Sequence, residues 1–335
     1  AYIALEIEGW HHLLLIRGLT NLKMLSRRDE SPLAKGCVAT IGNFDGVHLG
    51  HKTIIDQVKS KAEALGVPSV VMIFEPQPRE FFQGSEAPPR LMGFRQKFEA
   101  LLAEGIDIVL CLRFNQAFRS YSAMGFIDDV LIGGLAVRHL VVGDDFRFGC
   151  DRAGDFELLE KVGRDTGFTV ENTLTVTVDG ERVSSTRVRN SLTVNGLQKA
   201  DTLLGHPYRI RGRVVYGRQL GRQIGAPTAN ILLHRTPALR GVYVVAATLD
   251  DGARFDGVAN IGVRPTVDGK RPSLEVHLFD FAGTLYGQHL EVVFRHGLRD
   301  EEKFDSVDEL KEQIARDFDH ARAWIDENGS VKSAD

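Results

Sequence analysis

The chain has 335 residues, which is long for a single hydrophobic core and suits two domains of about 100–200 residues each. Its apolar fraction of 43% and charged fraction of 26% are those of a globular protein. A formal net charge of −4 gives no general attraction to nucleic acid or to an anionic membrane, so we expect neither as a partner.

The cysteines and the N-terminal segment indicate where the protein works. Cys37, Cys111 and Cys150 are far apart and show no CxxC pairing, which argues against a disulfide framework and against a thiolate metal site. The apolar run at 12–16 is too short to span a bilayer and lacks a small-residue cleavage site. We therefore expect a cytoplasmic protein.

Between Cys37 and about Gly205, short apolar runs alternate with helical patterns. The predicted strands cover 38–41, 70–74, 106–112 and 140–142. The first predicted helix ends at Gly66, a residue type that favours helix termination. This alternation predicts an α/β domain with a doubly wound parallel sheet, whose ligand lies at the carboxyl ends of the strands near a topological switch point.

After Gly205 the helical patterns give way to strands that are broken by Gly and Asp-Gly turns. The predicted strands cover 208–216, 241–249, 254–261, 273–281 and 289–295. Strands without intervening helices predict a small antiparallel β-barrel. Ser306 and Glu309 form a capping box that begins one closing helix. We therefore expect two domains, 14–203 and 204–328.

The first chemically informative segment is Gly42-Asn-Phe-Asp-Gly-Val-His-Leu-Gly-His51, which follows a predicted strand. A helix start offers unpaired backbone N–H groups and a positive dipole end, so it is suited to an anion. His48 and His51 are three residues apart and can share a helix face. Taken alone, they fit phosphate binding, metal binding or an ordinary polar surface, although no third metal ligand with convincing spacing follows. The segment is not the glycine fingerprint of NAD-binding proteins.

A second segment reads Ser184-Ser-Thr-Arg-Val-Arg189 and precedes a helical stretch. Its hydroxyl and guanidinium groups suit a polyphosphate. On its own, however, such a segment is more often a simple helix N-cap with solvated arginines.

Together the two segments resemble the HxGH and SSTxxR signatures of the nucleotidylyltransferase superfamily. With Phe74–Pro78 and Val142–Gly149, the first resembles the FMN adenylyltransferase module of bacterial bifunctional riboflavin kinase/FAD synthetases. The resemblance implies that the FMN phosphate attacks the α-phosphate of ATP and releases pyrophosphate, with Mg²⁺ bridging the phosphates and no covalent enzyme intermediate. It implies a nucleotide site made of Gly42, Phe44, Asp45, Gly46, His48, His51, Ser184, Ser185, Thr186, Arg187 and Arg189.

The same resemblance gives narrower expectations for single residues. His48 and His51 are expected to stabilise charge during catalysis, and Glu75 and Asp145 to help hold the flavin. Many members have His where this chain has Gln77, so we assign no essential base at that position.

A third chemically informative segment runs from Gly217 to Asn230. Gly217, Gly221 and Gly225 recur at four-residue spacing, so their backbone N–H groups can wrap a phosphate, although an ordinary hairpin fits the pattern too. Thr228 and Asn230 lie on one side of an extended segment and offer hard oxygen ligands for Mg²⁺. Without context, a turn with local backbone hydrogen bonds explains them equally well.

This segment resembles the PTAN motif of riboflavin kinases, in which the Thr and the Asn bind Mg-ADP. Segments 241–243, 260–266, 274–278, 285–287 and 298–304 match that family in order. The resemblance implies that Glu275 takes the proton from the ribityl 5′-hydroxyl and that Arg299 contacts the flavin. Ala226 stands where many members have Phe, which changes the packing of the loop.

The sequence thus predicts a bifunctional transferase that converts riboflavin to FMN and FMN to FAD, with ATP as co-substrate and Mg²⁺ as cofactor. A narrower alternative leaves one module inactive or gives the first module another phosphate ester. A different class of function is a flavin carrier, which needs none of Thr228, Asn230 and Glu275. The sequence does not indicate the oligomeric state.

Overall fold

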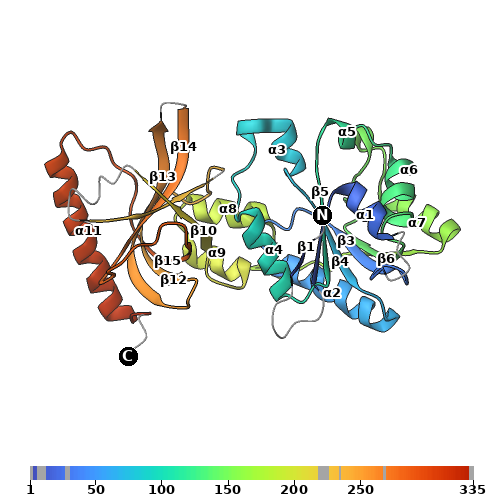
Figure 1. The fold of residues 1–335 in the computed structure, drawn as a ribbon, viewed down its shortest axis with the longest axis horizontal. Helices are drawn as coiled ribbons and strands as arrows, with labels where there is room; N and C mark the ends of the chain where they lie inside the picture. Colours follow the sequence, from blue (N-terminus) through green and yellow to red (C-terminus); the bar gives the residue numbers. More distant parts are fainter. Residues whose placement is uncertain are drawn as a thin grey trace. The chain divides into compact units, whose positions relative to one another are not determined.

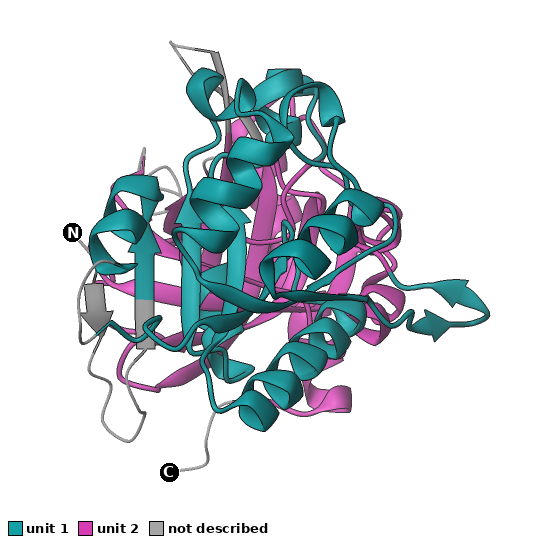
Figure 2. Ribbon diagram, turned by 90° about the vertical axis from the view of Figure 1, so that its right-hand side faces the viewer, with its two compact units in different colours: residues 1–88, 97–183 teal, residues 89–96, 184–335 magenta. Residues whose placement is uncertain are grey.

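The computed structural model describes residues 3–5, 13–26, 31–217, 226–233, 235–266 and 269–331. These residues group into two compact units, which we call unit 1 (1–88 with 97–183) and unit 2 (89–96 with 184–335), coloured separately in Figure 2. The units divide after residue 183, whereas the sequence predicts a domain boundary after 203. The assignment of 184–203 to the first catalytic domain therefore stays a prediction.

Unit 1 contains a seven-stranded sheet in the order β1-β2-β5-β4-β3-β6-β7 (Figure 1). All neighbouring pairs are parallel except β1 with β2. The strands are β1 (Ile3–Leu5), β2 (Leu13–Arg17), β3 (Cys37–Ile41), β4 (Ser69–Phe74), β5 (Ile108–Leu112), β6 (Val137–Val142) and β7 (Thr169–Asn172). From β3 the chain first builds β4 and β5 on one side and then β6 and β7 on the other, so the topological switch point lies between β3 and β6. This confirms the doubly wound sheet.

Helices connect these strands and cover the sheet. They are α1 (Gly18–Ser26), α2 (Leu49–Leu65), α3 (Pro78–Gln83), η1 (Gly84–Glu86), α4 (Phe94–Ala103), α5 (Gln116–Arg119), α6 (Ala123–Phe126), η2 (Ile127–Ile132), η3 (Cys150–Arg152) and α7 (Phe156–Thr166). Strands β3 and β5 are buried along their whole length, which is why they read as continuous apolar runs. Helix α2 buries Ile55, Val58 and Ala62, and Gly66 ends it in the left-handed conformation. A short hairpin, β8 (Thr177–Val178) and β9 (Glu181–Arg182), follows β7.

Unit 2 contains a closed six-stranded antiparallel barrel in the order β10-β11-β14-β13-β12-β15. Its elements are α8 (Ser185–Thr193), α9 (Leu197–Leu204), β10 (Arg209–Val215), β11 (Ala229–Leu232), β12 (Gly241–Leu249), β13 (Arg254–Thr266), β14 (Gly269–Leu278), β15 (His289–Arg299) and α11 (Val307–Asn328). Ser306 caps α11 by accepting a hydrogen bond from the backbone N–H of Glu309 at 3.1 Å. Figure 1 shows α11, in red, running alongside the barrel.

The helix α11 packs on the outer face of the barrel. Ala321 and Ile325 are buried there with Val242, Val244 and Val258, whereas alternate residues of the strands fill the barrel interior. Burying an aliphatic side chain of this size contributes about 1.5–3 kcal/mol, so the helix is held mainly by this apolar contact. The closing helix and the barrel predicted from the sequence are both confirmed.

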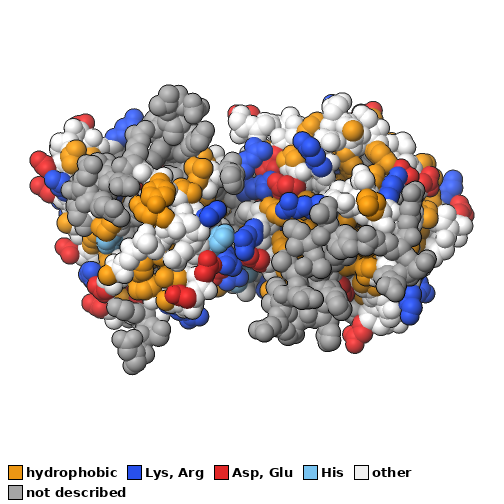
Figure 3. Space-filling model, in the orientation of Figure 1, with side chains coloured by type: hydrophobic (Ala, Val, Ile, Leu, Met, Phe, Trp, Pro, Cys, Tyr) orange, Lys and Arg blue, Asp and Glu red, His pale blue; other side chains and the backbone are white. Residues whose placement is uncertain are grey.

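The structure also differs from the predicted elements at several boundaries. Strands β1, β2, β7, β9 and β11 were not predicted as strands, and β13 and β15 extend further than expected. Strand β14 covers Gly269–Leu278 rather than 273–281. The run at 12–16 falls largely in β2, which pairs with β5 at the edge of the parallel strands. On the face shown in Figure 3, acidic and basic side chains are interspersed over each unit, in keeping with the small net charge.

Candidate active sites

The connection from β3 to α2 is a sharp turn with unusual backbone angles. Phe44 and Val47 have φ values of 46° and 39°, and Gly46 has 93°. A left-handed conformation costs a residue with a Cβ atom about 1–2 kcal/mol, so burial must hold the turn. Phe44 and Val47 are each 1% exposed, which anchors the segment in the core. The turn delivers the N-terminus of α2 to the carboxyl end of β3.

The two predicted histidines come together at this helix start. His48 is the N-cap of α2, and its Nδ1 accepts a hydrogen bond from the backbone N–H of His51 at 3.3 Å. The two imidazole rings stack with centroids 3.6 Å apart and an interplanar angle of 14°. Because Nδ1 of His48 accepts, the proton of its neutral form lies on Nε2, which is then a donor. The helix start and the paired rings make an arrangement suited to a phosphate group.

The Ser184–Arg189 segment begins helix α8 in unit 2. Ser184 caps this helix by accepting from the backbone N–H of Arg187 at 3.3 Å, and Arg189 donates from Nε to the carbonyl of Pro89 at 2.7 Å. Within unit 1, the carbonyl oxygen of Val183 lies 3.4 Å from the position that a Cβ atom on Gly50 would take. The chain therefore passes the helix start of α2 one residue before Ser184.

An aromatic cavity of about 680 Å³ lies at the switch point of unit 1. Its wall includes the end of β3 and the segment that follows β6. Phe74, Phe146, Arg147 and Phe148 come from the two segments that carry the family resemblance. The other aromatic and charged lining residues were not predicted: Arg79, Phe82, Phe114, Phe118, Arg119, Tyr121, Phe126, Asp151 and Arg152. A cavity with this composition suits a planar aromatic ring that carries an anionic group.

The aromatic rings that line this cavity contact one another and an arginine. The ring centroid of Phe118 lies 5.3 Å from that of Phe74 and 5.8 Å from that of Tyr121. The guanidinium carbon of Arg119 lies 5.4 Å from the ring centroid of Phe82. A hydrogen bond to Asp129, together with burial, raises the pKa of Tyr121 to about 12, so this phenol stays neutral. The wall is therefore aromatic and uncharged apart from its arginines and Asp151.

Glu75 and Asp145 stand next to this wall rather than in it. Phe74 and Phe146, their neighbours in sequence, line the cavity, whereas the described lining residues do not include the two carboxylates. The backbone N–H of Glu75 donates to the carbonyl of Leu112 at 3.0 Å, which continues the β4–β5 pairing. Their roles as flavin contacts stay predictions.

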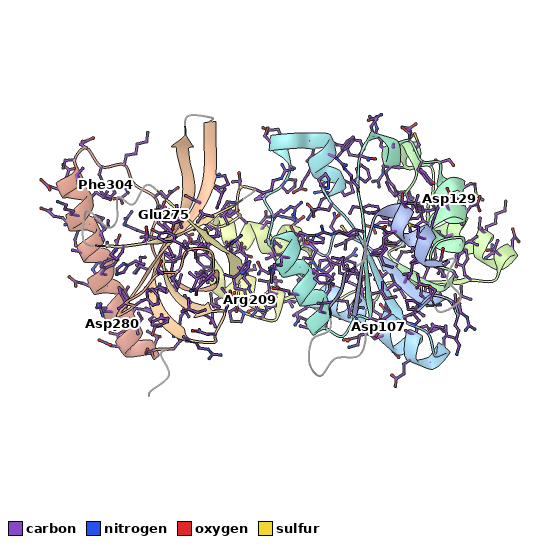
Figure 4. All side chains as sticks on the ribbon, in the orientation of Figure 1. Asp107, Asp129, Arg209, Glu275, Asp280 and Phe304 are labelled. Carbon is purple, nitrogen blue, oxygen red and sulfur yellow. The ribbon has the colours of Figure 1, made fainter. Side chains whose placement is uncertain are left out.

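In unit 2, strand register brings the predicted kinase residues to one level of the barrel. Asn230 of β11 is the partner of Glu275 of β14, and Glu275 is the partner of Asn260 of β13. Val242 of β12 pairs with Asn260 on one side and with Arg299 of β15 on the other. These five residues, Asn230, Glu275, Asn260, Val242 and Arg299, form a row across the barrel strands. Directly opposed residues project from the same side of a sheet, so the row lies on the outer face, under α11. Figure 4 labels Glu275 on the barrel and Phe304 beside the start of α11.

A cavity of about 220 Å³ lies between this row and α11. Thr228, Asn260, Glu275, Arg299, Phe304 and Phe318 are among its lining residues. A second cavity of about 90 Å³ is lined by Thr228 as well, with Leu285 and Tyr286. Thr228 thus stands where the two cavities adjoin.

The Thr228–Asn230 segment is shaped by one glycine. A Cβ atom on Gly217 would lie 2.6–2.7 Å from the side-chain amide atoms of Asn230, so only glycine leaves room for this amide. The amide nitrogen of Asn230 lies 3.2 Å from the carbonyl of Thr228 and 3.4 Å from its hydroxyl oxygen. The two side chains are therefore adjacent, and each carries a hard oxygen atom of the kind that Mg²⁺ prefers. The predicted phosphate-loop residues Gly221 and Gly225 lie outside the described residues.

Two contacts connect the site to α11. Arg299 donates from Nε and Nη2 to the carboxylate of Asp317 at 2.8–3.1 Å. His277 contacts the carbonyl of Pro227 through Nδ1 at 2.8 Å and stacks on Phe318 with centroids 4.4 Å apart. Burial lowers the pKa of His277 below its usual value, so the neutral ring with Nδ1 protonated and donating is favoured. Sequence analysis missed both Asp317 and His277, because their partners are distant in the chain.

Matches to known families cover both parts of the chain. A family model described as FAD synthetase matches residues 30–187, and one described as Riboflavin kinase matches residues 204–325. The chain is 54% identical over 311 residues to a bifunctional riboflavin kinase/FMN adenylyltransferase of Pseudomonas fluorescens, covering 92% of this chain and 97% of that protein. It is 49% identical over 312 residues to the protein of the same description from Escherichia coli K12, covering 93% and 97%.

A solved structure is also similar. A crystal structure described as a macrolide-efflux protein from Streptococcus pneumoniae aligns with a TM-score of 0.71 and 31% identity, over 86% of this chain and 94% of that one. Across the described residues, helices long and apolar enough to cross a membrane are absent. The same residues contain no group of three or more His, Cys, Asp or Glu side chains arranged to hold a metal ion.

Proposed function

The chain belongs to the bifunctional riboflavin kinase/FMN adenylyltransferase family, and we propose that the cavity beneath α11 makes FMN while the switch-point site of unit 1 takes part in making FAD. The enzyme phosphorylates riboflavin with ATP and adenylylates FMN with ATP. The observation that carries the division of labour is the barrel register, which aligns Asn230, Glu275 and Arg299 on one row.

For the kinase step, Glu275 serves as the base. Its carboxylate lies on the wall of the larger cavity and accepts the proton of the riboflavin 5′-hydroxyl as that oxygen attacks the γ-phosphate of ATP. Thr228 borders both cavities, so a nucleotide in the smaller one and a flavin in the larger one meet there. Thr228 and Asn230 would hold Mg²⁺, which would neutralise phosphate charge.

The flavin in this step is held on the α11 side of the barrel. Arg299, fixed by Asp317, supplies a positioned guanidinium at the end of the row, and Phe304 supplies an aromatic face. The residues Leu285 and Tyr286 of the smaller cavity are proposed to bind the nucleotide. The nucleotide role of Gly217 is proposed to be indirect, since it makes room for Asn230.

For the adenylyltransferase step, the aromatic cavity holds FMN and the start of α2 holds ATP. The isoalloxazine ring packs among Phe118, Phe146 and their neighbours, and the nearby arginines attract the FMN phosphate. His48 and His51 donate to the phosphates of ATP and stabilise the charge that develops as pyrophosphate leaves. Residues 184–189 are proposed to bind nucleotide phosphate through their hydroxyl and guanidinium groups, as the family resemblance implies.

The test is a product assay on the full chain with riboflavin, ATP and Mg²⁺, in which riboflavin, FMN and FAD are separated over time. The proposal expects FMN to appear first and FAD to follow. If FMN accumulates alone, the assignment of unit 1 is wrong and its substrate is another phosphate ester. If riboflavin binds tightly and neither product forms, the protein is a flavin carrier instead.

Both reactions are proposed to take place in the cytoplasm. The three cysteines are free, and two of them, Cys37 and Cys111, are buried in the core, which suits a reducing compartment. Burial raises the pKa of the Cys111 thiol to about 11, which keeps it unreactive. Riboflavin, FMN, FAD and ATP are the proposed partners.

A further inference from the structure

Asn260 lies beside Glu275 on the wall of the kinase cavity. The two residues are direct Cα partners in the β13–β14 ladder, so their side chains project from the same face about 4.5–5.5 Å apart at Cβ. The Oδ1 atom of Asn260 is buried, and none of the described residues donates a hydrogen bond to it. A buried amide oxygen without a donor lowers the stability of a folded protein. The unsatisfied acceptor therefore points to a ligand that supplies the missing donor.

The row on the barrel indicates which part of the ligand this is. Asn230 flanks Glu275 on one side and Asn260 flanks it on the other, followed by Val242 and Arg299. If phosphate arrives from the side of Asn230, the remainder of the acceptor molecule extends from Glu275 past Asn260. In riboflavin a chain of secondary hydroxyl groups adjoins the 5′-hydroxyl, and each hydroxyl is a hydrogen-bond donor.

We propose that Asn260 is a positioning and specificity residue of the kinase site, whose amide oxygen accepts a hydrogen bond from a secondary hydroxyl of the polyol chain. This inference rests on the proposed kinase function of the cavity. The spacing between Asn260 and Glu275 matches a hydroxyl one or two carbons from the one that is phosphorylated, namely the 4′- or the 3′-hydroxyl. Holding this hydroxyl fixes the terminal carbon and so orients the attacking oxygen toward the phosphate. The site thereby selects flavins with a hydroxylated side chain.

The experiment combines enzyme variants with altered substrates. Asn260→Ala and the nearly isosteric Asn260→Leu are assayed with riboflavin and with its 3′-deoxy and 4′-deoxy analogues, all of which retain the reactive 5′-hydroxyl. Asn328→Ala is the matched control, because Asn328 lies at the end of α11 and does not line the kinase cavity. FAD formation from supplied FMN by the same preparations reports on the integrity of unit 1.

With riboflavin, both Asn260 variants are expected to lose about 10- to 100-fold in kcat/KM, the loss that one hydrogen bond to a substrate hydroxyl supplies. For one of the two deoxy analogues, wild type loses a similar factor and the variants lose nothing further. Asn260→Leu is also expected to unfold at a temperature no lower than wild type, because it removes an unsatisfied buried oxygen. A purely structural role predicts the opposite change in unfolding temperature.

The proposal is overturned if the Asn260 variants keep wild-type kcat/KM for riboflavin. It is equally overturned if their loss is the same for riboflavin and for both deoxy analogues, because the amide then binds water or a protein group rather than the chain. Failure of the kinase assignment itself looks different, since wild type then forms no FMN from riboflavin.

Discussion

The ion pair between Arg299 and Asp317 gives a prediction whose size follows from the structure. The carboxylate of Asp317 is 5% exposed and receives three contacts from Arg299 at 2.8–3.1 Å and one from Gln313 at 2.8 Å. Asp317→Ala leaves the guanidinium of Arg299, which is 17% exposed, without its counter-charge. Removing one partner of a buried pair costs about 3–5 kcal/mol.

The lower end of that range applies here. Arg299 keeps some exposure, and its Nη1 still donates to the carbonyl of Asp300 at 3.0 Å. A loss of about 3 kcal/mol lowers the unfolding temperature of a unit of this size by about 6–12 °C. Riboflavin binding should weaken too, because Arg299 is no longer held at the end of the row.

Calorimetry on the full chain measures the shift, and the temperature at which kinase activity is lost assigns it to unit 2. Asp319→Ala is the matched control, since Asp319 is an exposed carboxylate on the same helix and its removal should change stability by less than about 0.5 kcal/mol. If Asp317→Ala unfolds at the same temperature as Asp319→Ala, the ion pair does not hold α11 to the barrel.

Two further predictions concern a glycine and a histidine. Gly217→Ala brings a methyl group against the side-chain amide of Asn230 and should displace it. We expect kinase kcat/KM to fall about 100-fold, with FAD formation from supplied FMN unchanged. Retained kinase activity would refute this packing role of Gly217. Burial, and to a lesser extent the charge of Lys61, lowers the pKa of His139. Below about pH 6.5 the unfolded chain therefore binds a proton at this residue that the folded chain does not bind. The free energy of unfolding then falls as the pH falls through that range. His139→Gln should therefore reduce the drop in unfolding temperature between about pH 7.5 and about pH 5.5. Part of the drop should remain, because the pKa of His277 is lowered as well. An unchanged drop would show that His139 is not responsible.

Local patterns were enough to predict the fold class and to single out the three chemically informative segments. The strands β3 and β4 are continuous apolar runs, and Ser306 and Gly66 mark helix ends by their residue type. Strand β11 escaped prediction because it is short and polar at Asn230, and it becomes a strand only by pairing with β10 and β14. Pairing between strands distant in the sequence leaves no local periodicity.

The site residues divide in the same way. His48 and His51 are close in sequence, so their pairing was predictable from spacing on one helix start. The row that joins Glu275 to Asn260 depends on barrel register, which a single sequence does not reveal. The aromatic cavity of unit 1 likewise gathers rings from 74–82, 114–126 and 146–148, and a single sequence does not reveal that these distant segments meet.

The central claim is that two separate sites perform the two steps, and one comparison tests it most directly. Glu275→Gln and His48→Ala are each assayed for FMN formation from riboflavin and for FAD formation from supplied FMN. Glu275→Gln should lose about 10²- to 10⁴-fold in the first reaction and keep the second, because a general base has been removed from the kinase site alone. His48→Ala should show the reverse pattern. Equal loss of both reactions in either variant would contradict the assignment of one reaction to each site.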